Sequence, residues 1–236
     1  MTRIDLEPID IILLDIEGTT TPIDFVYKTL FPYVRSHLVE FLNQGVDADD
    51  LAQIEAEYKQ ETDDTKPPWN LPPTDYLLWL MDQDRKSPGL KSIQGKIWEQ
   101  GYGQGVLQGV LFEDVFPAIQ SWSQRGVRIF IYSSGSVLAQ KLLFSKSSAG
   151  DLSPWISGYF DTKVGSKREA DSYKAIAQHI SIAPERCLFI SDIVPECEAA
   201  NRAGFQVRQA VRPGNNPQKS SFATISSFRD IELGFS

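Results

Sequence analysis

An apolar run that ends in two carboxylates constrains this chain more than any other feature. Residues 11–14 read Ile-Ile-Leu-Leu, a pattern typical of a strand buried on both faces of a sheet. Asp15 follows at once, Glu17 comes two residues later, and Gly18 permits a sharp turn. Ligands of open α/β sheets bind at the carboxyl ends of strands. We therefore expect the two carboxylates to face a metal ion and an electrophile, although a lone Asp at this position is usually a turn or cap residue.

Composition and charge exclude several classes of protein. The 236 residues suffice for one large domain or for a domain with an insertion. A net charge of −8 argues against a nucleic-acid partner, and no apolar run is long enough to cross a membrane. With two cysteines and two histidines, neither a disulfide framework nor a histidine-rich metal site is expected. A cytoplasmic location follows as the expectation for such cysteine usage.

Two blocks of different pattern divide the chain. Residues 24–111 carry apolar side chains at helical spacing and few strand signals, which predicts a helical cap inserted into an α/β core of residues 1–23 and 112–236. Asp49 and Asp50 are expected to cap one of the cap helices.

The glycines at positions 101, 103, 105 and 109 do not fit a phosphate loop, and they predict a flexible return that serves as a hinge. In the remaining core, strands and helices alternate. That order predicts a Rossmann-like parallel sheet with right-handed crossovers.

Two further predicted strands also end in polar side chains. Residues 127–132 lead into Ser133 and Ser134, and residues 187–190 lead through a serine into Asp192. Each of these polar groups has a simpler interpretation as a helix cap. Three such clusters at one edge of a parallel sheet nevertheless favour a functional site.

The chemistry that fits these groups is phosphoryl transfer through a covalent intermediate on Asp15. Two carboxylates about 4 Å apart repel by about 4 kcal/mol at an effective dielectric constant of 20, so a cation is expected between Asp15 and Glu17. Mg²⁺ suits a site of oxygen ligands, which Asp192 would complete. Ser133 would donate hydrogen bonds to phosphoryl oxygens, and Glu17 would act as general acid and base.

A fixed positive charge is still required on the transferred group. Lys167, where a loop is expected to enter a helix, is the candidate. Lys163, Arg168 and Lys174 compete with it, since most lysines are solvated surface residues.

Together, these motifs resemble the haloacid dehalogenase-like superfamily. The resemblance rests on Asp15-Ile-Glu-Gly-Thr, Ser133-Ser-Gly, Lys167 and Ser191-Asp192 with Glu196, in that order along the chain. A helical insertion between the first two motifs is similar to one type of cap in that superfamily. Most of its phosphatases carry Asp at the position of Glu17.

The chain more closely resembles the acireductone synthases, the bifunctional enolase-phosphatases of methionine salvage. Further stretches carry this resemblance, namely Ile97-Trp98, Gly101-Tyr102, Phe160-Asp-Thr-Lys163 and Arg212-Pro-Gly-Asn215. It implies a Mg²⁺ site at Asp15, Glu17 and Asp192, and substrate contacts from Ser133, Ser134 and Lys167. The implied reaction enolises 2,3-diketo-5-methylthiopentyl-1-phosphate and then dephosphorylates it to acireductone.

Three alternatives remain. Another small sugar or acid phosphate could be the substrate of the same fold. A dehalogenase would need neither the metal nor the second carboxylate, and a binding module would be indifferent to Mg²⁺. We expect a monomer that acts on a small phosphorylated diketone and binds neither nucleic acid nor membrane.

Overall fold

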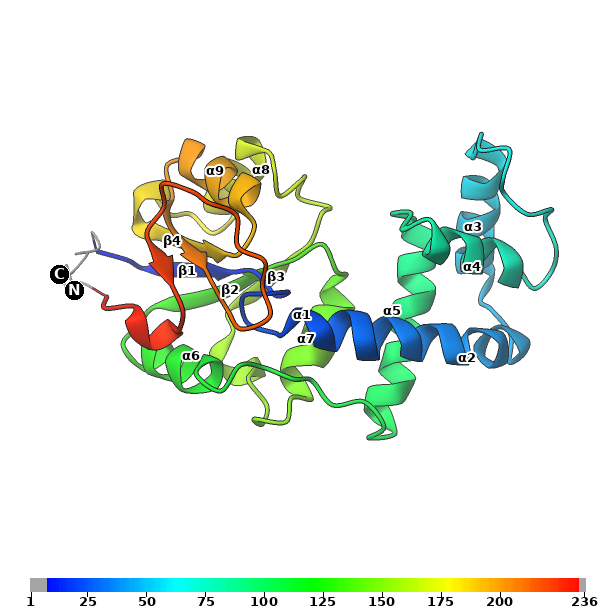
Figure 1. The fold of residues 1–236 in the computed structure, drawn as a ribbon, viewed down its shortest axis with the longest axis horizontal. Helices are drawn as coiled ribbons and strands as arrows, with labels where there is room; N and C mark the ends of the chain where they lie inside the picture. The colour runs from blue at the N-terminus through cyan, green and yellow to red at the C-terminus, as the bar shows by residue number, and fades with distance from the viewer. Residues whose placement is uncertain (1–7, 234–236) are drawn as a thin grey trace. The chain divides into compact units, whose positions relative to one another are not determined.

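The computed structural model describes residues 8–233, which form two compact units (Figure 1). One unit joins the segment up to Val26 with the segment from Gln108 onward, and the other is Tyr27–Leu107. The first is an α/β core and the second is helical. That the helical unit acts as a cap stays a prediction.

The core is built on a parallel six-stranded sheet with the strand order β3-β2-β1-β4-β5-β6. The strands are β1 (Ile11–Leu14), β2 (Arg128–Tyr132), β3 (Gly158–Phe160), β4 (Cys187–Ser191), β5 (Gln206–Ala210) and β6 (Thr224–Ile225). The side chains of β1 are entirely buried, as the apolar run predicts for a central strand. The predicted parallel α/β architecture is thus confirmed. Sequence patterns missed β3 and β6 because each is too short to show periodicity.

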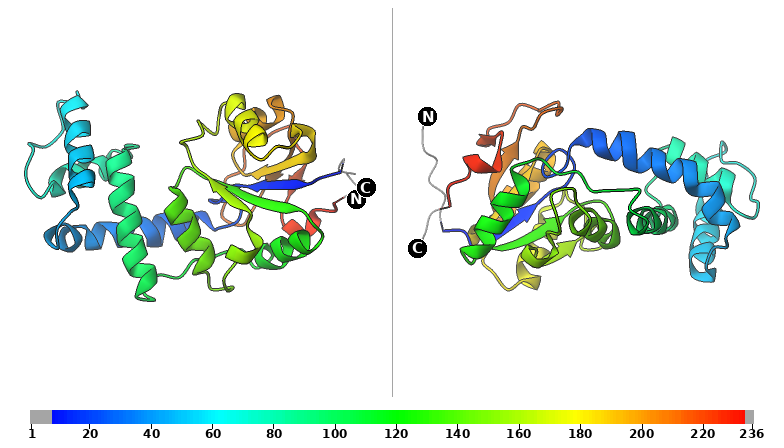
Figure 2. Two further views of the ribbon diagram at one scale, coloured as in Figure 1. Left: turned by 180° about the vertical axis from the view of Figure 1, so that it is seen from behind. Right: turned by 90° about the horizontal axis from the view of Figure 1, so that it is seen from below.

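Helices cover both faces of this sheet (Figure 2). Those of the core are α1 (Ile23–Phe25), α6 (Val115–Gln124), α7 (Val137–Ser145), α8 (Ala170–His179) and α9 (Val194–Arg202), with short 3-10 turns at Ser153–Trp155, Pro184–Arg186 and Phe228–Asp230. Tyr173 of α8 and Ala200 of α9 pack with Leu13 and Phe189 in one apolar cluster on one face of the sheet. This packing leaves the carboxyl ends of β1, β2 and β4 as the edge where polar side chains gather.

The helical unit consists of α2 (Phe31–Asn43), α3 (Ala48–Gln60), α4 (Thr74–Asp82) and α5 (Pro88–Gly103), preceded by a π-helical turn at Val26–Leu30. The N-cap of α3 is Asp47, whose side chain accepts a hydrogen bond from the Asp50 N–H. The prediction that Asp49 and Asp50 form this cap was therefore wrong by two residues. Both lie in the first turn, where carboxylates are also favourable.

The glycines of the return from the helical unit differ in their surroundings, and its role as a flexible hinge stays a prediction. Gly101 and Gly103 belong to the last turn of α5. Gly109 lies in the core, where its N–H donates to the Lys146 carbonyl and its carbonyl accepts from the Ser148 N–H. A Cβ at Gly109 would lie 2.2 Å from a backbone oxygen, so close packing accounts for this glycine.

Within residues 8–233, none of the helices has both the length and the apolar character needed to span a membrane.

Candidate active site

The strand register brings three predicted polar clusters to one place. β1 lies between β2 and β4, and Leu14 pairs with Ile131 on one side and Ile190 on the other. The backbone N–H of Asp15 continues this ladder by donating to the Ile190 carbonyl at 3.0 Å. The strand order reverses direction at β1, which is the point where ligands bind in open α/β sheets.

Asp15 is the centre of the site. Its carboxylate is buried, with one oxygen, Oδ1, hydrogen-bonded to the ammonium of Lys167. The other oxygen, Oδ2, accepts a hydrogen bond from Ser191 Oγ at 3.0 Å. A carboxylate held by two donors has a single orientation.

Lys167 connects Asp15 with a second carboxylate, Glu196. Its ammonium lies 2.7 Å from Glu196 Oε2, and only 7% of the lysine is exposed. Burial acts against the charged form, but the charges of Asp15 and Glu196 more than offset it and raise the pKa of Lys167. Lys167 therefore stays positively charged beside the carboxylate of Asp15.

The other candidate cations lie elsewhere. Lys163 and Arg168 are exposed, and Lys174 is exposed and paired with Asp171. Lys167 differs from them because two tyrosines hold its loop in place. The hydroxyl of Tyr173 donates to the Lys167 carbonyl at 2.8 Å, and the hydroxyl of Tyr132 donates to the Gly165 carbonyl at 3.0 Å.

Glu17 stands on a tight turn that follows β1. The turn is closed by bonds from the Gly18 N–H to the Thr21 carbonyl and from the Thr21 N–H to the Ile16 carbonyl. Burial, and then the charge of Asp15, raise the pKa of the Glu17 carboxyl, while the charge of Lys167 and, less strongly, a hydrogen bond with Ser133 oppose the shift. A raised pKa keeps a proton on Glu17 to higher pH, which is the state that a general acid needs.

Ser133 and Ser134, which follow β2, are not helix caps. Ser136 caps α7 by accepting a hydrogen bond from the Ala139 N–H. Ser133 is buried beside Glu17, and its Oγ accepts from the Gly135 N–H at 3.1 Å. Ser134 lies next along the chain and is exposed. The hydroxyl of Ser133 thus lies within the carboxylate cluster, whereas the contact predicted for Ser134 stays a prediction.

Asp192 is placed at the same edge by β4. Its N–H donates to Thr19 Oγ1 at 3.1 Å, and α9 begins after it with Ile193 as N-cap, so Asp192 does not cap that helix. Its Oδ1 atom is buried without a hydrogen-bond partner. Burial, followed by the charges of Asp15 and Glu196, raises the pKa of Asp192 to about 7. An unpartnered buried carboxylate oxygen beside other carboxylates is a position that a cation would stabilise.

The described residues contain no ready-made group of three His, Cys, Asp or Glu side chains arranged around a metal ion. Asp15 and Asp192 supply two carboxylates, and Glu17 is the third predicted ligand. A cation at this site would therefore take its remaining ligands from backbone, water or substrate oxygens. Mg²⁺ is commonly bound in that way, by one or two carboxylates with several waters.

Two groups at the site had no role in the sequence predictions. Ser191 Oγ lies 3.0 Å from both Asp15 Oδ2 and Glu196 Oε2, and it also accepts the Ile193 N–H. Since its hydroxyl has one proton, it cannot donate to both carboxylates at once. Burial and then the charge of Asp15 raise the pKa of Glu196 to about 7. Glu196 was noted only for its spacing from Asp192, which does not reveal its partner.

The chain is similar to known enzymes along most of its length. The family model for the haloacid dehalogenase-like hydrolases matches residues 9–204. An enolase-phosphatase E1 of Synechococcus elongatus is 54% identical over 93% of this chain and 96% of its own length. One from Xenopus tropicalis is 40% identical over 96% of this chain and 95% of its own. Among solved structures, the UTR4 protein of Saccharomyces cerevisiae superposes with a TM-score of 0.78 at 33% identity, covering 94% of this chain and 100% of that one.

Proposed function

This chain belongs to the haloacid dehalogenase-like hydrolases and, among them, to the enolase-phosphatases, and from that premise we propose how its residues perform the reaction. The observation that carries the proposal is the contact of Asp15 with the Lys167 ammonium at the point where the strand order reverses. We propose that the substrate is 2,3-diketo-5-methylthiopentyl-1-phosphate and that the product is acireductone, within methionine salvage.

Asp15 is the proposed nucleophile of the phosphatase half-reactions. One of its oxygens attacks phosphorus, the bond from phosphorus to the substrate oxygen breaks, and an aspartyl-phosphate forms. Water then attacks the same phosphorus atom, which releases phosphate and regenerates the Asp15 carboxylate. Lys167, held by Asp15 and Glu196, neutralises the charge on the phosphoryl oxygens, and Ser133 donates a hydrogen bond to them.

Glu17 is the proposed general acid and base. Its raised pKa supports the protonated form, which can give a proton to the leaving enediol oxygen. The resulting carboxylate then takes a proton from the attacking water, so that Glu17 ends each cycle protonated. Enolisation moves one further proton from carbon to a carbonyl oxygen, and the residue that removes it stays unassigned.

A Mg²⁺ ion fits the residues at this site. Asp15 and Asp192 would hold it through carboxylate oxygens, and the unpartnered Oδ1 of Asp192 is the atom that supports this assignment. Glu17, the third predicted ligand, would contribute its backbone carbonyl, because the bonds of the turn use the carbonyls of Ile16 and Thr21 instead. When bound, the ion supplies positive charge that lowers repulsion between the nucleophile and the phosphate.

The unit Tyr27–Leu107 is the proposed cap, which would supply contacts to the methylthio end of the substrate. A cytoplasmic, monomeric enzyme is part of the same proposal, and size-exclusion chromatography with light scattering tests the monomer.

The direct test follows enolisation and dephosphorylation together on the purified protein. With Mg²⁺ and the diketo-methylthiopentyl phosphate, enediol absorbance and free phosphate should rise, and Asp15→Asn should abolish phosphate release. Lys163→Gln is the matched control, because this lysine is exposed and outside the site. Phosphate release only from other phosphate esters would reassign the substrate and keep the mechanism. Absence of any phosphatase activity from the folded protein with Mg²⁺ would favour a binding module.

A further inference from the structure

A proline–glycine turn after β5 delivers an asparagine to the proposed metal site. Residues 211–223 form the loop that connects β5 to β6 (Figure 1), and Asn215 in this loop contacts the Gly18 carbonyl just beyond β1. In this segment the Asn215 N–H donates to the Arg212 carbonyl at 3.1 Å, across Pro213 and Gly214, and Gly214 has φ of +86°. Proline followed by a glycine with positive φ is the pattern of a type II turn. The backbone direction at Asn215 is therefore set by local sequence.

The residue that begins this turn anchors it firmly. The guanidinium of Arg212 donates to the Thr19 carbonyl at 3.0 Å and to Asp114 Oδ2 at 2.8 Å. It also lies over the rings of Phe112 and Phe228, at 4.8 and 4.5 Å from their centroids. Only 2% of the arginine side chain is exposed. The turn is thus attached to the loop that carries Glu17.

Asn215 joins two parts of the site that are far apart along the chain. Its Nδ2 donates to the Gly18 carbonyl at 2.9 Å and, at the longer distance of 3.4 Å, to Asp192 Oδ2. Because both neighbours are acceptors, the amide nitrogen rather than the amide oxygen must face them. The orientation of the Asn215 amide is consequently determined by its surroundings.

The same three residues are packed in contact. A Cβ placed on Gly18 would lie 2.4 Å from Asp192 Oδ2 and 3.2 Å from Asn215 Nδ2. Asp192 thus has one oxygen, Oδ2, held against Gly18 and Asn215, while its other oxygen, Oδ1, is buried without a partner. Rotation of this carboxylate would break its contact with Asn215.

We propose that Asn215 is a positioning residue that orients the Asp192 carboxylate for the cation, by holding Oδ2 and leaving Oδ1 free. This inference rests on the proposed function, specifically on its metal site. Groups that hydrogen-bond to metal ligands fix the ligand orientation, and their loss typically weakens metal affinity tenfold to a hundredfold. Asn215 suits this task because a neutral amide donates to Asp192 without adding charge, whereas a carboxylate at the same position would repel it.

The test measures Mg²⁺ binding without substrate, by isothermal titration calorimetry. Asn215→Ala removes the amide, and Asn215→Leu keeps a branched side chain of similar shape without a donor. Asn216→Ala is the matched control, because Asn216 is the adjacent asparagine and is exposed. We expect both Asn215 variants to raise the Mg²⁺ Kd by about tenfold or more and the control to leave it unchanged. Excess Mg²⁺ should restore most of kcat, which a purely structural defect would not allow.

Each outcome bears on the inference. A Kd within about twofold of the unsubstituted protein in either folded Asn215 variant would overturn it, while the metal site itself would stand. A Kd raised in Asn215→Ala but normal in Asn215→Leu would also overturn it, since packing rather than the hydrogen bond would then matter. Failure of the unsubstituted protein to bind Mg²⁺ would overturn the proposed metal assignment, and this inference with it.

Discussion

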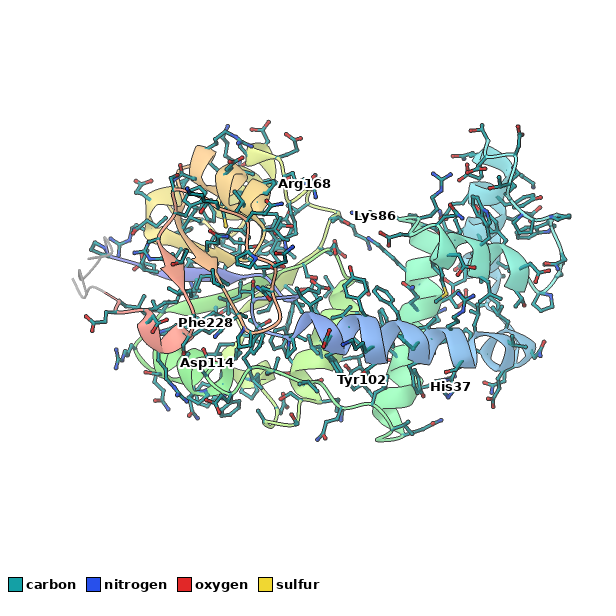
Figure 3. All side chains as sticks on the ribbon, viewed as in Figure 1. His37, Lys86, Tyr102, Asp114, Arg168 and Phe228 are labelled. Atoms are coloured by element: carbon teal, nitrogen blue, oxygen red, sulfur yellow. The ribbon has the colours of Figure 1, made fainter. Side chains whose placement is uncertain are left out.

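Replacement of Arg212 by methionine should destabilise the core by about 3–5 kcal/mol at pH 7, the usual cost of removing one partner from a buried ion pair. The pair joins Arg212 Nη1 to Asp114 Oδ2 at 2.8 Å, and the two side chains are 2% and 5% exposed. Asp114 also accepts hydrogen bonds from the Phe228 N–H and the Ser227 hydroxyl, and Asp114 and Phe228 are labelled in Figure 3. These two donors would remain after the substitution, so the lower half of the range is expected.

Protonation of Asp114 gives an independent estimate of the destabilisation expected for Arg212→Met. Burial acts to raise the pKa of Asp114, but the Phe228 N–H and the Arg212 guanidinium together hold it below its ordinary value. The ionised Asp114 carboxylate therefore stabilises the fold at pH values above its ordinary pKa. That stabilisation is lost as the pH falls through the lowered pKa of the folded state. Without Arg212, Asp114 can take up a proton, which from an ordinary pKa of about 3.9 costs about 4 kcal/mol at pH 7 and about 1.5 kcal/mol at pH 5. The electrostatic part of the destabilisation should thus shrink between these two pH values.

Urea unfolding at both pH values measures the effect on the core transition. Arg229→Met is a matched control, because Arg229 pairs with the neighbouring Glu113 at 3.8 Å while both side chains are largely exposed. An exposed pair of this kind contributes about 0–1 kcal/mol. A cost below about 1 kcal/mol for Arg212→Met at pH 7, or equal costs at pH 5 and pH 7, would refute the assignment of this stability to the buried ion pair.

Three further predictions concern the site itself. In metal-free protein the pKa of Asp192 and of Glu196 is raised to about 7, so the folded state binds these protons more tightly than the unfolded state. The unfolding temperature should then fall as pH rises from about 5 to about 8, and saturating Mg²⁺ should remove most of that fall; a flat profile would contradict the raised pKa values. Gly18→Ala should weaken Mg²⁺ binding, because φ is +70° and the new Cβ would meet Asp192, whereas Gly126→Ala, with φ of +87° and open space, should leave binding unchanged in the same titration. Glu17→Asp should slow enolisation and phosphate release by unequal factors, since the shorter side chain shifts the acid relative to the leaving oxygen; equal losses in the two assays would argue against this.

The sequence alone determined the strands whose burial is local and continuous. The apolar run at 11–14 and the carboxylates after it predict a central strand and a site at its end, because a strand buried on both faces lies inside a sheet and ligands bind at the carboxyl ends of such strands. The positions of Asp15, Ser133 and Asp192 at one sheet edge follow from parallel strands, and the structure brings them together. β3 and β6 escaped prediction, since two or three residues show no period.

Only the tertiary structure decided which groups contact one another across the site. Four basic residues competed as the source of positive charge for the transferred group, and the position of Lys167 at the site depends on a loop held by Tyr132 and Tyr173. Asn215 meets the Gly18 carbonyl across 197 positions of the chain. Such contacts depend on strand order and loop packing, which local periodicity does not encode. Short sequence motifs thus predict which residues belong to the site. Their hydrogen-bond partners depend on how distant segments fold onto one edge of the sheet.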